Sequence, residues 1–203
     1  LRMIDDLNKT YEELYNEKRH TEKVSSFHNS LTLGISQGMN IEQIIATIYS
    51  TLNVPVLIQD LSFNTHQYVG LTEEEFDLLA EDFARQMPQT RSGKILIQPI
   101  DPMHAIQVDC PNHTRLISPI TVHQQIIGYI SFIYLSKDHN FKEEMNYVQR
   151  SAVCISLWHL NEKSSLEAIE NIKAFLFEQL LQQQYTSKKN IINRCYLLQI
   201  DLN

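Results

Sequence analysis

Residues 114–135 have the sequence TRLISPITVHQQIIGYISFIYL, and this stretch decides the fold. Two apolar runs, at 114–122 and 125–135, are rich in β-branched and aromatic residues and are separated by a short polar turn. This pattern predicts two antiparallel strands joined in a hairpin. The longest apolar stretch of the chain lies in the second run and is about half as long as the ~20 residues that a membrane helix needs. We therefore expect a strand there and no association with a membrane.

Shorter runs of similar composition precede this hairpin. They predict strands at 54–60, 65–69, 94–100 and 104–109, the first two pairing around a turn near residues 62–64. Strands close in sequence, combined with flanking helices, are typical of an α+β fold. We predict a mostly antiparallel central sheet with helices gathered on one face and long helices at both ends of the chain.

The first long helix is expected within residues 1–37, which are polar and favour helix formation. Ile4, Leu7, Tyr11 and Leu14 recur at steps of three and four and form a narrow apolar seam. Such a seam favours a dimer-forming, coiled-coil helix, and a helix docked on its own domain is the alternative.

Capping signals place the boundaries of the next helices. Gly38 is expected to end the first helix as a left-handed cap. Asn40, with Gln43 three residues later, predicts a capping box for a second helix. Thr72 is the expected N-cap of a helix that runs to residue 87, with an acidic first turn and a buried stripe. The members of this stripe are Phe76, Leu79 and Phe83.

The carboxyl-terminal part is expected to be a long helix that follows Asp138 or Asn140. A break is predicted at Ser164-Ser165, and a short helix is predicted to begin after Ser187. Residues 198–202 have the pattern of a strand, and the chain begins with Leu1 rather than Met. We therefore expect this chain to be a piece of a longer protein.

The composition narrows the class of function. The chain has a formal net charge of −7 and contains no basic block, which disfavours direct binding to nucleic acid or to an anionic membrane. Glycine is scarce, with 5 residues, and neither GxGxxG nor GxxxxGK[ST] occurs. A glycine-cradled phosphate site is therefore disfavoured. We expect a protein that is not an enzyme and that needs no cofactor.

The three cysteines are far apart and lack CxxC spacing. They fit free thiols in a reducing cytoplasm better than a disulfide framework. We found no signal peptide, and the expected location is therefore cytoplasmic.

The segment Gly34-Ile35-Ser36-Gln37-Gly38 matches GxSxG, the nucleophile elbow of α/β-hydrolases. That chemistry needs the serine on a strained turn between a strand and a helix. A junction between two helices explains both glycines without catalysis, and we prefer that interpretation.

His104, Cys110 and His113 gather within ten residues. Imidazole and thiolate groups at this spacing could hold a transition metal, but CxxH is only half a structural zinc site. Surface histidines and a buried thiol explain the same residues. The cysteine could instead carry a bilin or respond to oxidation, although nothing nearby predicts a lowered thiol pKa.

Tyr68, Arg115, Tyr129 and Tyr134 lie on the predicted strands. They could supply polar groups to an apolar pocket, which commonly combines apolar walls with a few hydrogen-bonding groups. Packing within a sheet explains the tyrosines equally well.

Several segments resemble a GAF domain. Residues 40–45 followed by 54–60 resemble the opening of that domain, and 115–120 followed by 127–130 look like its closing hairpin, R-x-x-x-P-I and x-G-Y-I. The family's NKFDE signature for cyclic nucleotides is absent. The resemblance implies a ligand-sensing module. The residues singled out above then become the candidate ligand-binding residues: Tyr68, His104, Cys110, His113, Arg115 and Tyr129.

The carboxyl-terminal segment 175–181, followed by 197–202, is similar to a junction in PucR-type and sugar-diacid transcriptional regulators. There a GAF-like sensor meets a degenerate GGDEF-like domain, with a helix-turn-helix beyond it. The apolar seam predicts an amphipathic or coiled-coil helix at 1–38. The resemblance, which begins at about residue 39, implies a GAF-like sensor at 39–162 and a helical linker into a truncated GGDEF-like domain at 163–203.

The function implied is small-molecule sensing and dimerisation in a cytoplasmic transcriptional regulator. The expected partners are a second copy bound through the terminal helices, an unidentified effector, and DNA reached only through a domain absent from this chain. Two alternatives stay open at this point. One is a ligand-free structural dimerisation module, and the other is the sensory domain of a histidine kinase or nucleotide cyclase.

Overall fold

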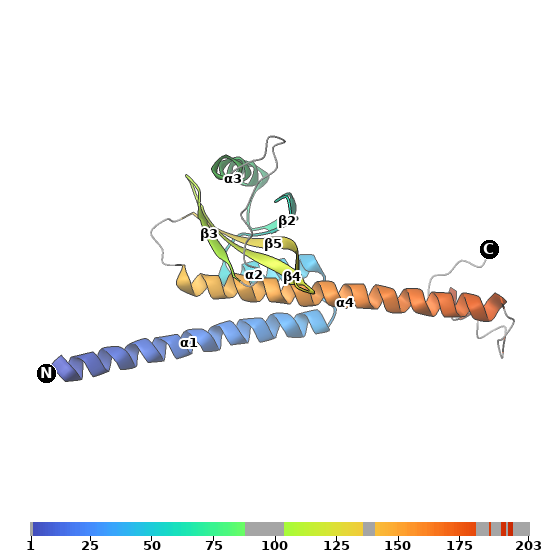
Figure 1. Cartoon of the computed structure of the whole chain (residues 1–203), viewed down its shortest axis with the longest axis horizontal. Coiled ribbons are helices and arrows are strands. Elements are labelled where there is room, and N and C mark those ends of the chain that lie inside the picture. Colours follow the sequence, from blue (N-terminus) through green and yellow to red (C-terminus); the bar gives the residue numbers. More distant parts are fainter. Residues whose placement is uncertain are drawn as a thin grey trace. The chain divides into compact units, whose positions relative to one another are not determined.

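The computed structural model describes residues 2–87, 104–135 and 141–181, together with 187, 192–193 and 195–196. It contains four helices and five strands within those residues (Figure 1). In chain order they are α1 (Arg2–Ser36), α2 (Ile41–Leu52), β1 (Val56–Gln59), β2 (Thr65–Val69), α3 (Glu73–Gln86), β3 (Ile106–Asp109), β4 (Thr114–Val122), β5 (Gln125–Tyr134) and α4 (Lys142–Leu181).

The five strands form one sheet in the order β2-β1-β5-β4-β3, and every neighbouring pair is antiparallel. The β4–β5 hairpin is its centre, with register from Thr114 opposite Tyr134 to Val122 opposite Gln125. His123 and Gln124, which connect the two strands, have φ angles of 49° and 64°. Positive φ at both central residues matches the twist of a two-residue hairpin turn, here without glycine. The predicted α+β class with an antiparallel sheet flanked by helices is therefore confirmed.

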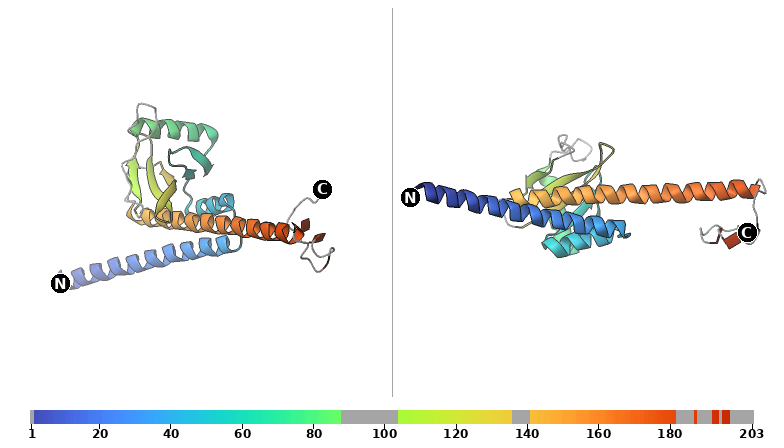
Figure 2. Two further views of the ribbon diagram at one scale, coloured as in Figure 1. Left: turned by 45° about the vertical axis from the view of Figure 1, so that its right-hand side comes forward. Right: turned by 90° about the horizontal axis from the view of Figure 1, so that it is seen from below.

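One face of the sheet is covered by α2 and the first part of α4, and α1 packs on the far side of these two helices (Figures 1 and 2). Alternate residues of the strands reach this core, since successive side chains of a strand point to opposite faces. The main core contains residues from all these elements: Phe27 and Leu31 of α1, Ile44 and Ile48 of α2, Val56 of β1, Leu116 of β4, Ile130 and Phe132 of β5, and Val148 and Ile155 of α4.

The opposite face is covered by α3, which differs from the predicted gathering of helices on one face. Leu57 of β1 and Ile133 of β5 pack there against Leu79, while Ile117 of β4 packs with Phe83. The sheet is covered on both sides, and for this reason β4 and the second half of β5 are buried at nearly every position rather than at alternate ones.

Both capping boxes are present as predicted. Asn40 accepts a hydrogen bond from the Gln43 N–H at 2.9 Å, and the Gln43 side chain accepts from the Asn40 N–H at 3.0 Å. Thr72 and Glu75 make the same reciprocal pair at the start of α3. Gly38, just beyond α1, has a φ of 91°, which fits the predicted left-handed cap.

The predicted break at Ser164-Ser165 is wrong, because α4 continues without interruption to Leu181. A serine inside a helix costs only a few tenths of a kcal/mol, and no Gly or Pro interrupts this segment. The i,i+4 pair between Lys163 and Glu167, with a 4.0 Å N–O distance, also lies on this part of the helix. The predicted strand at 94–100, the cap at 138 or 140 and the strand at 198–202 lie outside the described residues.

The chain divides into two units, Leu1–Trp158 and His159–Asn203. The first contains the sheet, α1 to α3 and the beginning of α4. In the second, the helix exposes Leu166, Ile169 and Ile172, whereas Leu176 is buried.

No described helix has a stretch that is long and apolar enough to cross a membrane.

Candidate ligand cavity behind helix α3

A cavity of about 200 Å³ lies between α3 and the sheet face that this helix covers. Its lining comes from β1, the turn between β1 and β2, the first residue of β2, α3 and β4. The lining residues are Leu57, Gln59, Ser62, Phe63, Asn64, Thr65, Phe76, Ala80, Phe83, Ala84 and Arg115. Apolar walls with a few convergent polar groups are typical of small-molecule sites.

Two other pockets are larger, but among the described residues one is lined by a single buried polar residue, Asp82, and the other by none. One, of about 320 Å³, includes Glu81, Arg85 and Leu78, and the Leu78 side chain is 69% exposed. The other, of about 290 Å³, lies between α1 and α4 and includes His20 and the exposed Arg150. The smaller cavity is therefore the candidate site.

Arg115 on β4 is the charged residue of the cavity, and only 1% of its surface is exposed. Its Nη2 donates to the Leu79 carbonyl oxygen at 2.7 Å, and its Nε donates to His113 Nε2 at 2.9 Å. The guanidinium carbon lies 4.0 Å from the centre of the Phe83 ring. Burial lowers the pKa of Arg115 from 12.5 to about 10. The group remains charged at neutral pH, but folding has removed much of its hydration.

His113 connects Arg115 to α3. Because the Arg115 Nε–H can only donate, His113 Nε2 accepts, and the ring proton belongs on Nδ1. This Nδ1 lies 3.2 Å from Asp82 Oδ2, which also accepts from the Asn112 N–H at 3.0 Å. Burial raises the pKa of the Asp82 carboxyl, but the hydrogen bonds from Asn112 and His113 outweigh it, and the pKa lies below its usual value. Asp82 thus fastens α3 to the strand that carries Arg115.

A second polar group lies at the β1 side of the cavity, around Gln59. Ser131 Oγ donates to Gln59 Oε1 at 2.7 Å, and Gln59 Nε2 donates to the Phe63 carbonyl oxygen at 3.0 Å and to Thr65 Oγ1 at 3.4 Å. Gly128 allows the close approach of β5 at this point, since a Cβ there would lie 2.5 Å from the Gln59 carbonyl oxygen. The Gln59 side chain is therefore held in a fixed orientation.

The turn between β1 and β2 presents Phe63 to the cavity in a strained conformation. Its φ is 62°, which is uncommon for a bulky residue. Asp60 holds the turn, because its carboxylate accepts from the Ser62 and Asn64 N–H groups at 2.7 and 2.9 Å. The Phe63 ring stacks on Tyr129 with centroids 4.4 Å apart. Strain of this kind is found preferentially at functional sites.

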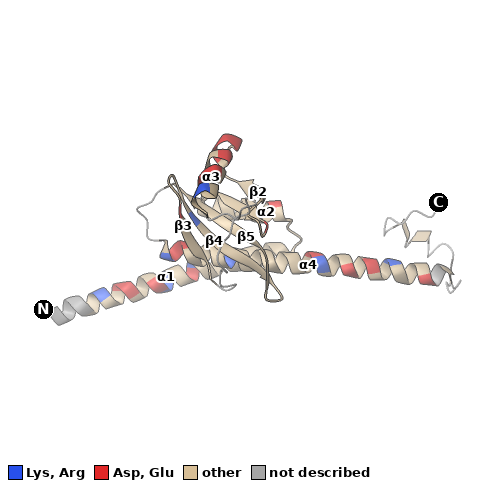
Figure 3. Ribbon diagram, turned by 45° about the horizontal axis from the view of Figure 1, so that its top comes forward, with Lys and Arg blue, Asp and Glu red and all other residues tan. Residues whose placement is uncertain are grey.

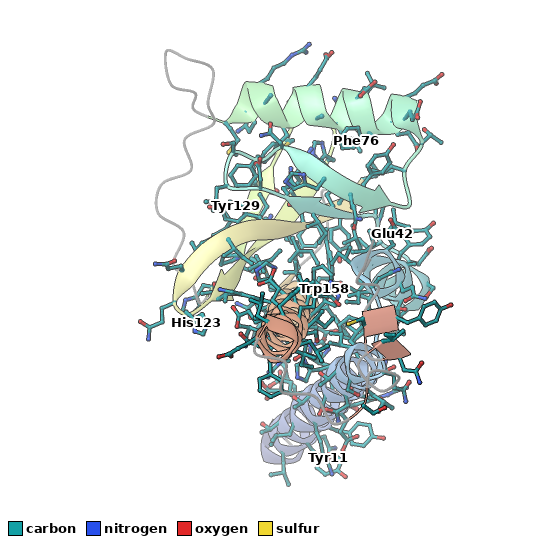
Figure 4. The ribbon with its side chains drawn as sticks, turned by 90° about the vertical axis from the view of Figure 1, so that its right-hand side faces the viewer. Tyr11, Glu42, Phe76, His123, Tyr129 and Trp158 are labelled. Carbon is teal, nitrogen blue, oxygen red and sulfur yellow. The ribbon has the colours of Figure 1, made fainter. Side chains whose placement is uncertain are left out.

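The predicted site residues divide into groups. Arg115 lines the cavity, and the fully buried His113 bonds to it. Tyr129 stacks on Phe63, and Cys110 belongs to the same buried cluster. In Figure 4, Phe76 and Tyr129 both lie in the layer between α3 and the sheet.

The remaining two predicted residues lie apart from the Arg115 side of the cavity. Tyr68 on β2 stacks on Phe76, which lines the opposite wall, with centroids 4.5 Å apart. His104 is exposed ahead of β3. Among the described residues, no three His, Cys, Asp or Glu side chains gather closely enough to hold a metal ion.

Ser36 of the GxSxG match is in the last turn of α1, and its Oγ donates to the Leu33 carbonyl oxygen at 2.7 Å. Its neighbours are helical, so the strand-to-helix turn that a nucleophile elbow requires is not formed here. The match is therefore explained by the helix–helix junction.

The sequence reasoning did not identify Gln59, Phe63 and Asp82 as site residues. Asp82 is one of many acidic residues of α3, most of which lie on its outer face (Figure 3). One signal was available, because Asp82 falls next to Phe83 and three residues after Leu79, on the stripe predicted to be buried. Phe63 gave no such signal, because its position depends on the turn that Asp60 holds.

Comparisons with known proteins found similarity only among solved structures. No protein-family model matches the chain, and no curated protein matches it. The chain is similar to the GAF domain of an Acinetobacter phosphoenolpyruvate-protein phosphotransferase, with 10% identity and a TM-score of 0.41 over 68% of this chain and 93% of that one.

Two further solved structures show comparable similarity. A GAF domain/HD domain protein from Geobacter sulfurreducens has 15% identity and a TM-score of 0.36, over 62% of this chain and 98% of that one. The cofactor-binding GAF domain of the nutrient sensor CodY from Clostridium difficile has 12% identity and a TM-score of 0.34, over 71% and 96%. The fold described above rests on the chain's own strand order and pairing.

Proposed function

We propose that this chain is a GAF-like sensory domain that binds a small effector in the cavity between α3 and the sheet. The observation that carries the proposal is that Arg115, Gln59 and three phenylalanine rings line one partly open cavity. A cavity serving only for packing would be filled by apolar side chains, since protein interiors are close-packed. Buried polar groups that line a cavity with apolar walls are what a binding site requires.

The effector would act through α3. This helix contributes Phe76, Ala80 and Phe83 to the cavity, and the bond from His113 to Asp82 fastens it to the sheet. A ligand that fits one position of α3 better than another shifts the population toward that position. Only this difference in affinity can do so, because a ligand bound equally well in both positions changes nothing.

We further propose that the output passes through the terminal helices of a homodimer. Leu7, Tyr11 and Leu14 of α1 are 71%, 71% and 61% exposed, and Tyr11 points away from the sheet in Figure 4. Their spacing of four and three residues is that of a coiled-coil seam. Sedimentation velocity tests this proposal. The wild-type chain is expected to be a dimer and Tyr11→Glu a monomer, whereas a wild-type monomer would contradict it.

In this proposal the module belongs to a cytoplasmic transcriptional regulator of the PucR type. It has no enzymatic activity and needs no cofactor, and it contacts DNA only through a further domain. The net charge of −7 supports the last point, because a DNA-binding surface needs clustered positive charge. A gel-shift assay at physiological salt is expected to show no binding by this chain alone.

A ligand-free dimerisation module is the second candidate. The observation in its favour is that Arg115 already has hydrogen-bonding partners within the protein, so that the cavity could persist empty. The sensory domain of a histidine kinase or cyclase would use the same cavity. A kinase core or an intact GGDEF motif in the full-length sequence would favour that assignment.

The decisive experiment blocks the cavity. Ala84 lines it from α3, and Ala84→Leu would fill part of its volume. Asp77→Leu adds the same side chain at an exposed position of the same helix and serves as the control. Native mass spectrometry of the purified chains is expected to detect a bound small molecule in the wild type and in Asp77→Leu, but not in Ala84→Leu. An identical spectrum for all three chains, without added mass, would support the ligand-free alternative.

A further inference from the structure

We propose that the effector is a small organic monocarboxylate, whose carboxylate pairs with Arg115 and whose apolar body lies against the phenylalanine rings. This inference rests on the proposed function, because it names the chemical class of the ligand for the same cavity. It is carried by the charge and shape of the lining.

The described lining carries a single formal charge. Of its eleven residues, Arg115 is the one cation, and there is no Asp or Glu among them. The polar remainder consists of the neutral side chains of Gln59, Ser62, Asn64 and Thr65. A ligand with a positive charge would meet Arg115 without a compensating carboxylate. Among the described lining residues, the one charged group is therefore suited to pair with an anion.

Arg115 retains capacity to bind that anion. Two of its five N–H donors bond to described groups, the Leu79 carbonyl oxygen and His113 Nε2. Both acceptors are neutral, since His113 carries its proton on Nδ1. The carboxylate nearest along this series of hydrogen bonds is Asp82, which is separated from Arg115 by the His113 ring. Arg115 is almost fully buried and contacts no carboxylate directly among the described residues, and a guanidinium in this state forms strong, charge-assisted bonds to an incoming one.

The number of charges favours a carboxylate over a phosphate. A phosphate monoester carries about −1.5 to −2 charges near neutral pH, so that part of its charge would be buried without a partner beside a single arginine. A carboxylate carries one negative charge and matches the guanidinium geometry with two parallel hydrogen bonds. The experiment below distinguishes a carboxylate ligand from a phosphate ligand.

The rest of the lining requires an apolar ligand body. Phe63, Phe76 and Phe83 surround the space together with Leu57, which lies on the sheet. Phe63 is held by its stack on Tyr129 and Phe76 by its stack on Tyr68, so two of the three rings are fixed in position. A flat or branched hydrocarbon group can fill the space between them, and the volume of about 200 Å³ limits it to a small molecule.

The test compares three probes that share one apolar group: phenylacetate, phenylacetamide and phenyl phosphate. Their affinities for the 203-residue chain are measured by isothermal titration calorimetry at neutral pH. Phenylacetate is expected to bind at least about tenfold more tightly than the amide, because only the acid forms the charged pair. Phenyl phosphate is expected to bind more weakly than phenylacetate.

Two variants locate the binding. Ala84→Leu is expected to abolish phenylacetate binding, whereas the control Asp77→Leu retains it. Arg115→Met is expected to bind the acid and the amide equally, and its unfolding curve in urea reports whether it is folded. If a variant fails to fold, the comparison of phenylacetate with phenylacetamide on the wild-type chain still tests the inference.

The outcomes separate the two proposals. An amide that binds the wild type as tightly as the acid, and is excluded by Ala84→Leu, would overturn the monocarboxylate class while leaving the sensory function supported. Tighter binding of phenyl phosphate would do the same and would favour a phosphorylated ligand. Phenylacetate binding that survives in Ala84→Leu, or the absence of binding by all three probes, would overturn the inference.

Discussion

Replacing Arg115 by Met is expected to have a small effect on stability for so deeply buried a residue. Met has a similar length and an apolar, flexible side chain, so it can occupy the same space. A pKa of about 10, compared with the ordinary 12.5, means that folding disfavours the guanidinium charge by about 3 kcal/mol. The folded-state pKa is the lower one, so this cost is fully present at neutral pH and is relieved only above about pH 10.

The interactions that Arg115 makes offset this cost. Its hydrogen bonds to the Leu79 carbonyl oxygen and to His113 contribute about 0.5–1.5 kcal/mol each. Its position over the Phe83 ring adds about 0.5–2 kcal/mol. The two sides nearly cancel, but Met removes the donor to the buried His113 Nε2, which costs about 1–3 kcal/mol, so Arg115→Met should lower the free energy of unfolding by no more than about 3 kcal/mol.

Urea unfolding at neutral pH measures this difference, followed by far-UV circular dichroism and by the fluorescence of Trp158. Removing one partner of a buried structural ion pair usually costs about 3–5 kcal/mol. A loss in that range, with an unchanged m value, would refute the reasoning and show that Arg115 is a structural residue. A small change in the free energy of unfolding, combined with equal binding of phenylacetate and phenylacetamide, would indicate that Arg115 serves ligand binding.

Three further perturbations test other parts of the account. Gly128→Ala should destabilise the chain by about 1–3 kcal/mol, because its Cβ would meet the Gln59 carbonyl oxygen. The control Gly34→Ala meets only the flexible end of a methionine side chain and should be tolerated in thermal unfolding. Asp82 has a lowered pKa, so the contribution of its carboxylate is complete above about pH 4 and is lost as the pH falls. The urea midpoint should therefore fall less between about pH 5 and pH 3 in Asp82→Asn than in the wild type, and equal falls would contradict this contribution. Ser36→Ala should leave the hydrolysis of p-nitrophenyl acetate unchanged, and a clear loss of activity would revive the hydrolase interpretation.

Much of the fold could be predicted because its signals are local. The capping boxes at Asn40 and Thr72 depend on residues three apart, and the structure contains both. The β4–β5 hairpin follows from composition and the short turn within Thr114–Tyr134. The break predicted at Ser164-Ser165 was wrong because a weak helix preference cannot end a helix whose neighbours all favour it.

The candidate site was predicted only in part, because its contacts join distant segments. Arg115 stood out as a charge within an apolar strand, and Tyr129 as an aromatic on the neighbouring one. Asp82 contacts His113 across 31 residues of sequence, and Ser131 donates to Gln59 across 72. No periodicity within one element specifies such pairs, since they depend on how α3 and the strands pack together.

The central claim is that ligand binding in the cavity acts on α3. Hydrogen–deuterium exchange of the wild-type chain, with and without phenylacetate, tests this claim most directly. The account predicts slower exchange in α3 and in the turn between β1 and β2, unchanged exchange in α2, and no effect of phenylacetate on Ala84→Leu. Exchange in α3 that is unaffected by phenylacetate, or slowed equally in Ala84→Leu, would contradict it.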